Sequence, residues 1–266
     1  MEFAYHAPPG ALAGAIKTIW TARGSKEEFD SPEPIVPDGC VEIIFNLADP
    51  FTNGGRQPLD LFAGQMTRAV VAVPTGAVDL IGVRFRPGRA GAALRTPMWR
   101  LQDQLIDASS VIAGSDRLVE DLRNMPQALR FAFLTVTLAT RLGSTARSAT
   151  AVDHALAIIR ARGGNVVIDK LARHVGLTRR HLERRFKEEV GLGAKQVARI
   201  ARVHAVLQLL EQQPLLSGAE IAAHCGYSDQ SHMIRECKAI AGHTPAGLMT
   251  SERSLAGLMR GQPQSS

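Results

Sequence analysis

The sequence predicts an α+β protein of two domains, with a small antiparallel β barrel or sandwich-like domain with helices at residues 1–145 and an all-α domain at residues 151–255. Three observations lead to this prediction. The chain of 266 residues is long enough to bury two modest cores. Short β-rich runs divided by Pro and Gly occupy the first part of the chain. Apolar residues at helical spacing dominate the second half.

Three apolar runs rich in β-branched residues are expected to form strands. They are CVEIIFNL (40–47), VVAVP (70–74) and VDLIGVRF (78–85). Turn signals such as TNGG (52–55) and RPGR (86–89) bound them. Short strands at this spacing favour an antiparallel barrel or sandwich.

The pattern changes to helical spacing after Gly88. SDRLVEDLRN (115–124) and ALRFAFLTVTLATRL (128–142) are the clearer helices of this segment. GSTARSAT (143–150) is small, polar and without periodicity, so we expect an interdomain linker there. No apolar run reaches the roughly 18 residues that a membrane span requires, and the N-terminus lacks the pattern of a secretory signal. We therefore expect no membrane association.

Charge is distributed unevenly along the chain. Residues 1–150 contain 15 Lys and Arg and 15 Asp and Glu, whereas residues 151–266 contain 16 and 10 and carry the whole net charge of +6. This asymmetry is expected when one domain meets a polyanion, although basic solvated faces are also common. The three cysteines, Cys40, Cys225 and Cys237, are too few and too scattered for a disulfide framework, which favours a reducing cytoplasm.

The second half is expected to be helical almost throughout. Glycines that suit the left-handed position after a helix follow several of its apolar segments. The longest helix carries an apolar stripe, and Ser217 and Glu220 stand at capping-box spacing at the start of another. The expected helical stretches are HALAIIRAR (154–162), IDKLARHVG (168–176), TRRHLERRFKEEVG (178–191), AKQVARIARVHAVLQLLEQ (194–212) and SGAEIAAHCG (217–226).

An internal repeat organises these helices. LARHVG (171–176) recurs 50 residues later as IAAHCG (221–226), and HLERRFKEEVG (181–191) recurs 51 residues later as HMIRECKAIAG (232–242). The difference places one extra residue between the two helices of the second copy. Each copy has a small residue on its first helix, a glycine four residues later, and an apolar pair four residues apart on its second helix. This pattern predicts two helix-turn-helix units joined by the long helix.

Details of the two copies differ. Thr178 and Ser228 are expected to cap the second helix of each unit. Cys237 occupies the core position that Phe186 holds in the first copy. Because the exchange of Phe for Cys removes apolar volume, we expect a looser core in the second unit.

The segment GYSDQSHMIRECKAIAGHTP (226–245) resembles the C-terminal signature of the AraC/XylS family of bacterial transcription regulators, which usually has a buried phenylalanine at the position of Cys237. The resemblance covers about residues 152–250. PDGCVEIIFNL (37–47) and VDLIGVRFRPG (78–88) are similar to a regulatory domain found ahead of this module. The resemblance implies a DNA-binding transcriptional regulator whose N-terminal domain senses a small-molecule effector, mediates homodimerisation, or both. It further implies double-stranded DNA as a partner, RNA polymerase as a second partner if the protein is an activator, and no cofactor.

In this architecture the second helix of each unit lies in the major groove of DNA. Arginine can pair with guanine there and a carboxylate can accept from cytosine. The expected base contacts are Arg180, Glu183, Arg184, Gln230, Ser231 and Arg235. The expected phosphate contacts are Thr178, Arg179, Arg185, Lys187, Lys195, Arg199 and Lys238. For each residue the alternative is a solvated helix face.

Five polar residues within or next to the expected strands are candidates for effector binding, namely Glu42, Asn46, Gln65, Arg84 and Arg86. Arg84 and Arg86 share a strand face, which would suit an anionic ligand. The alternative is that all five occupy solvent-facing positions of their strands.

Two other kinds of site are considered and set aside. The stretch from His224 to Pro245 gathers three histidines and two cysteines, but Cys225 and Cys237 fall at core positions of separate helices rather than at converging zinc-ligand positions. We expect neither a metal nor catalytic residues. The alternative function is a DNA-modifying or repair enzyme that uses the same DNA-binding module, as the adaptive-response DNA alkyltransferases do. It would need a reactive cysteine, and Cys40 is the only cysteine of the first half.

Overall fold

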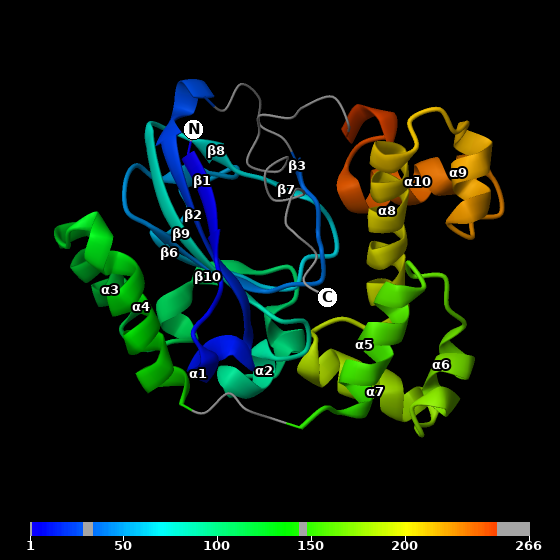
Figure 1. Ribbon diagram of the computed structural model, residues 1–266, viewed down its shortest axis with the longest axis horizontal. Helices are drawn as coiled ribbons and strands as arrows, with labels where there is room; N and C mark the ends of the chain where they lie inside the picture. The colour runs from blue at the N-terminus through cyan, green and yellow to red at the C-terminus, as the bar shows by residue number, and fades with distance from the viewer. Residues whose placement is uncertain (1, 29–33, 144–147, 249–266) are drawn as a thin grey trace.

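The computed structural model describes residues 2–28, 34–143 and 148–248, and it shows an α+β chain in which a sheet with attached helices precedes an all-helical part (Figure 1). The two parts have separate hydrophobic cores. The predicted fold class is therefore confirmed at this level. Within the described ranges, no helix is long and apolar enough to cross a membrane.

The sheet has six strands and all its pairings are antiparallel. In order across the sheet they are β1 (Glu2–His6), β2 (Ile16–Ser25), β9 (Ala77–Phe85), β4 (Glu42–Asn46), β6 (Asp60–Ala63) and β10 (Leu105–Asp107). No pairing joins the outer strands β1 and β10 in the part of the chain that is described, so the sheet stays open and the predicted barrel is wrong. Three-residue β10 gives this edge too little length to continue the ladder around a barrel.

Two short ribbons accompany the sheet. One pairs β3 (Pro34–Ile35) with β7 (Val70–Val71), and the other pairs β5 (Phe51–Thr52) with β8 (Val73–Pro74). The predicted strand at 70–74 is thus divided at Ala72 between two ribbons. The resulting arrangement keeps a sandwich-like element without a second full sheet.

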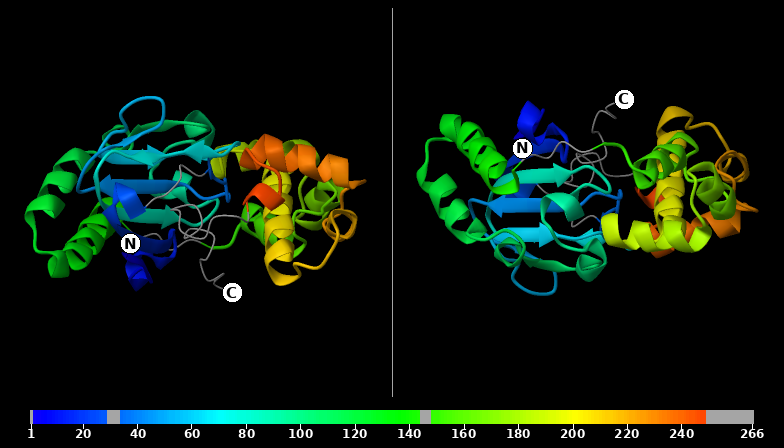
Figure 2. Two further views of the ribbon diagram at one scale, coloured as in Figure 1. Left: turned by 90° about the horizontal axis from the view of Figure 1, so that it is seen from above. Right: turned by 90° about the horizontal axis from the view of Figure 1, so that it is seen from below.

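Helices cover the face of the sheet that is turned away from the two ribbons (Figure 2). They are α1 (Gly10–Ala13), α3 (Ser115–Asn124) and α4 (Gln127–Leu142), and α3 and α4 lie where the periodicity predicts them. Their apolar side chains pack on Ile43, Phe45 and Val83, which alternate with residues that face the ribbons. Short helical turns complete this part at η1 (Lys26–Glu28), α2 (Ala90–Ala93), η2 (Met98–Leu101) and η3 (Ala108–Ser110).

The helical part contains the two predicted helix-turn-helix units. Its elements are α5 (Ala151–Ala161), α6 (Ile168–His174), α7 (Arg179–Glu189), α8 (Ala194–Gln212), α9 (Gly218–His224), α10 (Gln230–Ala241) and η4 (Ala246–Leu248). The first unit is α6–α7 and the second is α9–α10, with one more residue in the second turn, as predicted. Gly176 and Gly226 both have φ +73°, a left-handed conformation that lets each turn close. Figure 1 shows α8 running between the two units.

Candidate nucleic-acid interface and sheet cavity

Helix α7 carries three predicted base contacts, Arg180, Glu183 and Arg184, in its first two turns. Leu182 and Phe186 face inward and are fully buried, as the spacing predicts. Arg180 and Arg184 are exposed on the outer side. The Thr178 hydroxyl caps the helix by accepting a hydrogen bond from the His181 backbone N–H at 3.3 Å. The start of α7 is therefore capped, and its outer side is accessible to a partner.

Helix α10 repeats this arrangement with a different cap. Met233 and Cys237 are buried, whereas Ser231 and Arg235 are exposed. The capping residue is Asp229, whose Oδ1 accepts from the His232 N–H at 2.7 Å. The predicted cap at Ser228 is wrong because the extra residue in the second turn shifts the helix start by one position. The Ser228 hydroxyl instead donates to Asp229 Oδ2 at 3.1 Å.

Glu183 and Gln230 lie beside the starts of neighbouring helices. The Glu183 carboxylate is so close to Gly193, the N-cap of α8, that a Cβ there would stand 2.5 Å from its Oε2. The Gln230 amide covers Gly218, the first residue of α9, in the same manner. Both side chains therefore have local packing roles, which leaves the exposed arginines as the freer candidates for reading bases.

A buried carboxylate, missed in the sequence analysis, organises the second unit. Glu236 is 7% exposed. Its Oε2 accepts from Arg199 Nε at 2.9 Å, and its Oε1 accepts from Arg202 Nε at 3.2 Å and from the Tyr227 hydroxyl at 3.2 Å. Burial and this carboxylate raise the pKa of Tyr227 above its ordinary value. The signal was present in the spacing, because position 236 lies on the same helix face as Met233 and Ile240.

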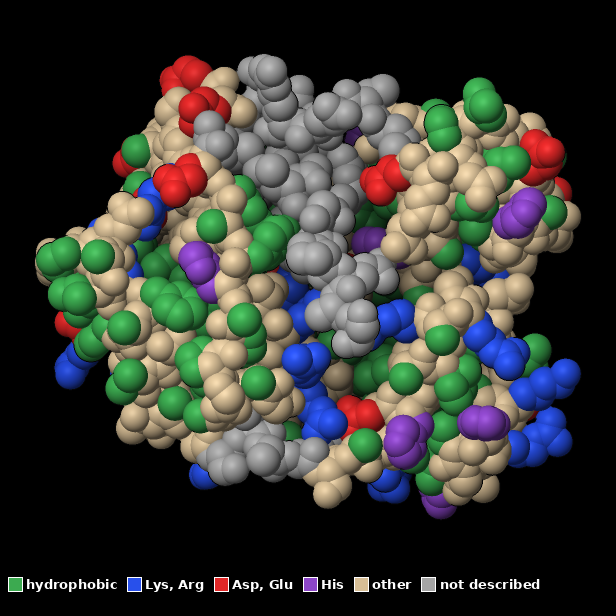
Figure 3. Space-filling view, in the orientation of Figure 1, with side chains coloured by type: hydrophobic (Ala, Val, Ile, Leu, Met, Phe, Trp, Pro, Cys, Tyr) green, Lys and Arg blue, Asp and Glu red, His purple; other side chains and the backbone are tan. Residues whose placement is uncertain are grey.

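The predicted phosphate contacts fall into two groups. Arg199 and Arg185 are held by carboxylates, Arg199 by Glu236 and Arg185 by Glu189 at 2.7 Å. The others have exposed side chains. Among them, Arg179 forms a solvent-exposed ion pair with Asp169 at 3.3 Å. Basic side chains gather on the edge of the molecule beside α6 and α7 (Figure 3). The exposed group consists of Thr178, Arg179, Lys187, Lys195 and Lys238.

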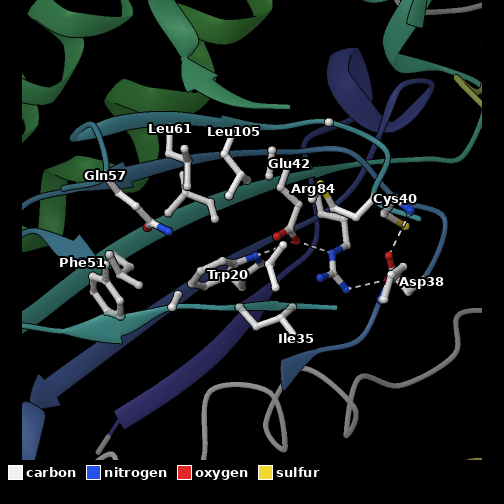
Figure 4. A pocket seen from close by; sticks show the side chains of 18 of the residues that line it. Trp20, Ile35, Asp38, Cys40, Glu42, Phe51, Gln57, Leu61, Arg84 and Leu105 are labelled. Atoms are coloured by element: carbon white, nitrogen blue, oxygen red, sulfur yellow. Dashed lines mark hydrogen bonds and ion pairs between the residues drawn. The ribbon is translucent and has the colours of Figure 1, made fainter. Parts of the chain in front are cut away.

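A cavity of about 100 Å³ lies between the sheet and the two ribbons. Strands β2, β4, β6 and β9 form its floor with side chains of one face, and the ribbons and the loop that follows β3 form its rim. Most of the lining is apolar, and Figure 4 shows Phe51 and Leu61 at one end with Asp38 and Cys40 at the other. Gly82 allows the Trp20 ring to lie across β9, because a Cβ there would stand 2.0 Å from the indole.

A charged cluster forms the polar wall of this cavity. Arg84 is 4% exposed and its Nε donates to Glu42 Oε1, which also accepts from Trp20 Nε1 at 3.1 Å. A second guanidinium nitrogen of Arg84 lies 3.1 Å from Asp38 Oδ2. Burial alone would raise the pKa of the Asp38 carboxyl, but the positive charges of Arg84, Lys17 and His204 outweigh it and lower this pKa to about 2. Asp38 is therefore an anion at neutral pH and pairs with Arg84 as one.

The structure gathers three of the five effector candidates at the cavity. Glu42, Asn46 and Arg84 line it. Gln65 is buried behind the rim, where its Nε2 donates to the carbonyl of Gly39 and its Oε1 has no partner among the described residues. Arg86 is exposed, lies beyond the end of β9 and donates to the carbonyl of Ala13 at 2.8 Å. The predicted shared face of Arg84 and Arg86 is therefore not found.

The rim of the cavity touches the helical part. The carbonyl of Pro37 lies 2.7 Å from His204 Nε2 near the middle of α8. The backbone N–H of Ala69, next to β7, donates to the carbonyl of Ile240 in α10 at 2.7 Å. Elsewhere Arg89 pairs with Asp153 of α5 at 3.0 Å. The loop that holds Asp38 against Arg84 thus also contacts the helix between the two units.

An Asp38→Asn variant is expected to be less stable than the wild type by about 1–2 kcal/mol at neutral pH, because Arg84 loses one of its two ion pairs. The pKa of Asp38 is lowered, so its stabilisation is complete above the ordinary value of 3.8 and is lost as the pH falls toward about 2. Urea unfolding at several pH values would show a constant difference above pH 5, narrowing in more acidic solution. An equal difference at all pH values would contradict the ion-pair role. Asp121→Asn, at an exposed site on α3, is the matched control.

Cysteine and histidine positions do not converge. Within the described ranges, no group of three or more His, Cys, Asp or Glu side chains is arranged to hold a metal ion. Cys225 and Cys237 are buried. Burial and Asp38 raise the pKa of the Cys40 thiol to about 12.

Two protein families match separate parts of the chain. Residues 4–107 match a family described as a domain of unknown function (DUF6597), and residues 171–251 match a helix-turn-helix domain. A curated relative, the HTH-type transcriptional regulator GlxA of Rhizobium meliloti (strain 1021), is 37% identical over 78 residues. This match spans 29% of the present chain and 24% of the relative, or about a quarter of its length.

Several solved structures are also similar. A regulator from Chromobacterium violaceum with an AraC-type DNA-binding domain is 27% identical, with a TM-score of 0.35, and the match covers 42% of this chain and 94% of that one. ToxT from Vibrio cholerae is 9% identical, with a TM-score of 0.48 over 94% of this chain and 100% of that one. ToxT with a bound unsaturated fatty acid is 9% identical, with a TM-score of 0.43 over 81% and 87%.

Proposed function

We propose that this chain, whose C-terminal part is an AraC-type helix-turn-helix domain, is a sequence-specific DNA-binding transcriptional regulator controlled by a small molecule. The observation that carries the proposal is the pair of helix-turn-helix units, each with an exposed arginine on a capped second helix. We assign residues 1–145 to regulation and residues 151–255 to DNA binding; residues 1, 144, 145 and 249–255 lie outside the described ranges. The function implies a cytoplasmic location.

The length of α8 suits binding to two successive turns of DNA. Its 19 residues rise about 28 Å at 1.5 Å per residue, which is close to the roughly 34 Å between successive major-groove segments on one face of DNA. Neighbouring contacts hold α8 at its start, where Glu183 lies against Gly193, and near its middle, where Glu236 binds Arg199 and Arg202. We infer that α8 spaces α7 and α10 to read two half-sites together.

Arg184→Ala and Arg235→Ala are each expected to reduce discrimination between the target and unrelated DNA by about 1–3 kcal/mol, because each removes a side chain able to pair bidentately with guanine. The target would first be selected in vitro from random DNA. Titrations with target and scrambled duplexes would then give the ratio of the two affinities for each variant.

Lys187→Ala is the matched control on the same helix. As a phosphate contact, Lys187 should contribute equally to the affinities for target and scrambled DNA. Its loss should reduce the slope of log affinity against log salt concentration by about one. If both arginine variants keep the wild-type ratio of affinities, the two helices do not read bases through these residues. If the wild type itself selects no sequence, the proposed function fails.

The cavity is our candidate for the effector site. It is mostly apolar, it contains a few buried polar groups, and its rim reaches α8 through Pro37. A ligand that moves the loop around Asp38 would disturb the contact between Pro37 and His204, and thereby the position of the helix that spaces the two units. An effector can control the protein only if it binds one state of the chain more tightly than another. Here the two states would differ in whether Pro37 contacts His204.

The enzyme alternative receives less support. An alkyltransferase needs a thiolate, whereas burial and Asp38 raise the pKa of Cys40 to about 12 and keep this thiol protonated. We therefore propose that the protein acts by binding alone. RNA polymerase as a partner of an activator, and a second copy of the chain as a dimer partner, belong to the same proposal.

A further inference from the structure

The polar wall of the cavity is more acidic than a site for an anionic ligand would be. The described charged residues that line it are Asp38, Glu42 and Arg84, so negative groups exceed positive groups by one. Arg84 already pairs with both carboxylates. Two of the three guanidinium nitrogens are thus occupied, and an anion on the remaining one would lie against a wall whose net charge is already negative.

One carboxylate oxygen of Glu42, Oε2, is available to accept a hydrogen bond from a ligand. Oε1 accepts from both Trp20 and Arg84, whereas no hydrogen bond from the described residues reaches Oε2, although Glu42 is only 7% exposed. Figure 4 shows the Glu42 carboxylate in the middle of the cavity, between Trp20 and Arg84. A carboxylate oxygen that borders a cavity without a partner favours a donor, and a charged donor most of all.

The rest of the lining suits an apolar body with a cationic end. Trp20 and Phe51 offer aromatic surface, which attracts both apolar groups and cations. Gln57 adds a polar side chain near Phe51 (Figure 4). Lys17 adds positive potential, but it acts on Asp38 and Cys40 at the far end of the wall.

We propose that the cavity between the sheet and the two ribbons binds an aromatic or aliphatic molecule with a protonated amine, and that this amine donates to Glu42 Oε2. The assignment of this ligand as the effector rests on the proposed function, whereas its binding does not. The same carboxylate holds Arg84, which holds Asp38 and with it the loop that contacts α8. A cation on Glu42 weakens the hold on Arg84, so binding and the contact at His204 are linked.

Three probes with one compact alkyl body, chosen to suit a cavity of about 100 Å³, separate the head-group chemistry. They are 3-methylbutylamine, 3-methylbutan-1-ol and 3-methylbutanoate. Trp20 reports binding by fluorescence in a full-length Trp99→Phe background, since the chain has two tryptophans and Trp99 is 50% exposed outside the cavity. The amine is expected to bind about tenfold more tightly than the alcohol, which corresponds to one charge-assisted hydrogen bond, and the carboxylate most weakly.

Two variants locate the amine. Glu42→Gln should weaken binding of the amine about tenfold and leave that of the alcohol within about twofold, so the alcohol also shows that the variant is folded. Ala63→Phe, which fills the cavity from β6, should abolish binding of all three probes. The proposal is overturned if the carboxylate binds best, if the three probes bind alike, if none binds, or if Glu42→Gln leaves the amine unaffected. None of these results involves DNA, so the proposed function is tested separately, by whether the wild type selects a DNA sequence.

Discussion

Replacing Phe186 with alanine is expected to lower the free energy of unfolding of the helical part by about 3–5 kcal/mol. The side chain is fully buried in the core that α5, α6, α7 and α8 share, so the substitution leaves a cavity that these helices can only partly close. Urea unfolding of the full-length chain, followed by far-ultraviolet circular dichroism, would show a lower midpoint for the helical part. The first unit should also bind DNA more weakly, because α7 loses its anchor.

The matched comparisons are Val136→Ala and Cys237→Ala. Val136 is 67% exposed on α4, so its truncation should change stability by less than about 0.5 kcal/mol. Cys237 is fully buried at the position equivalent to Phe186, but its truncation removes only the sulfur and should cost about 1 kcal/mol. Equal losses for Phe186→Ala and Val136→Ala would show that the core does not depend on Phe186.

Removal of the Glu236 carboxylate is expected to destabilise the second unit by about 2–4 kcal/mol. In a Glu236→Ala variant, Arg199 and Arg202 lose their common counter-charge and the Tyr227 hydroxyl loses its acceptor. This expected loss of stability is slightly smaller than the loss that usually follows the removal of one partner from a buried ion pair. The reason is that both arginines are partly exposed, so water screens their charges. Thermal unfolding and DNA titration of the variant would measure the two consequences, lower stability and a weaker contribution from α10.

Two controls separate charge from shape. Glu236→Gln keeps an acceptor for Tyr227 but not the negative charge, so it should recover less than half of the lost stability. Glu211→Ala removes an exposed carboxylate at the end of α8 and should have almost no effect. If Glu236→Ala resembles Glu211→Ala, the network contributes nothing to the second unit.

The helical part could be predicted in detail because local rules agree with the tertiary structure there. Gly176 and Gly226 have the positive φ that their turns require, and Leu182 and Met233 are buried as their spacing predicts. Ser228 resembles Thr178 in residue type, but it does not cap its helix, because the extra residue in the second turn moves the helix start to Asp229. Caps depend on one residue of register, which periodicity does not resolve.

The sheet was less predictable, because its strands pair across long sequence separations. The ten-residue strand β2 mixes polar and apolar residues without a turn signal, and it was not recognised although it pairs with β9 at the centre of the sheet. Whether a sheet closes depends on its edge strands, and β10 is only three residues long. The cavity follows from this open sheet and its ribbons, so only some of its residues could be named in advance.

The predicted looseness of the second core was based on one position. In the second copy, Tyr227 stands where the first copy has Leu177, and Cys237 stands where the first has Phe186. Tyr227 is buried, and Cys237 lies close enough to help raise the pKa of the Tyr227 hydroxyl, after burial and Glu236. The second copy thus has its aromatic side chain in the turn, at Tyr227, and the first copy has it on the second helix, at Phe186. The exchange at Cys237 alone therefore does not determine how well this core is packed.

The contact between Pro37 and His204 falls on α8, away from the exposed arginines of α7 and α10. In the function that we propose, operator choice and ligand response therefore depend on different residues of the same chain. During divergence, a lineage could exchange one small-molecule signal for another through the cavity lining while keeping its set of controlled promoters. It could equally acquire new promoters through Arg184 and Arg235 while responding to the same signal.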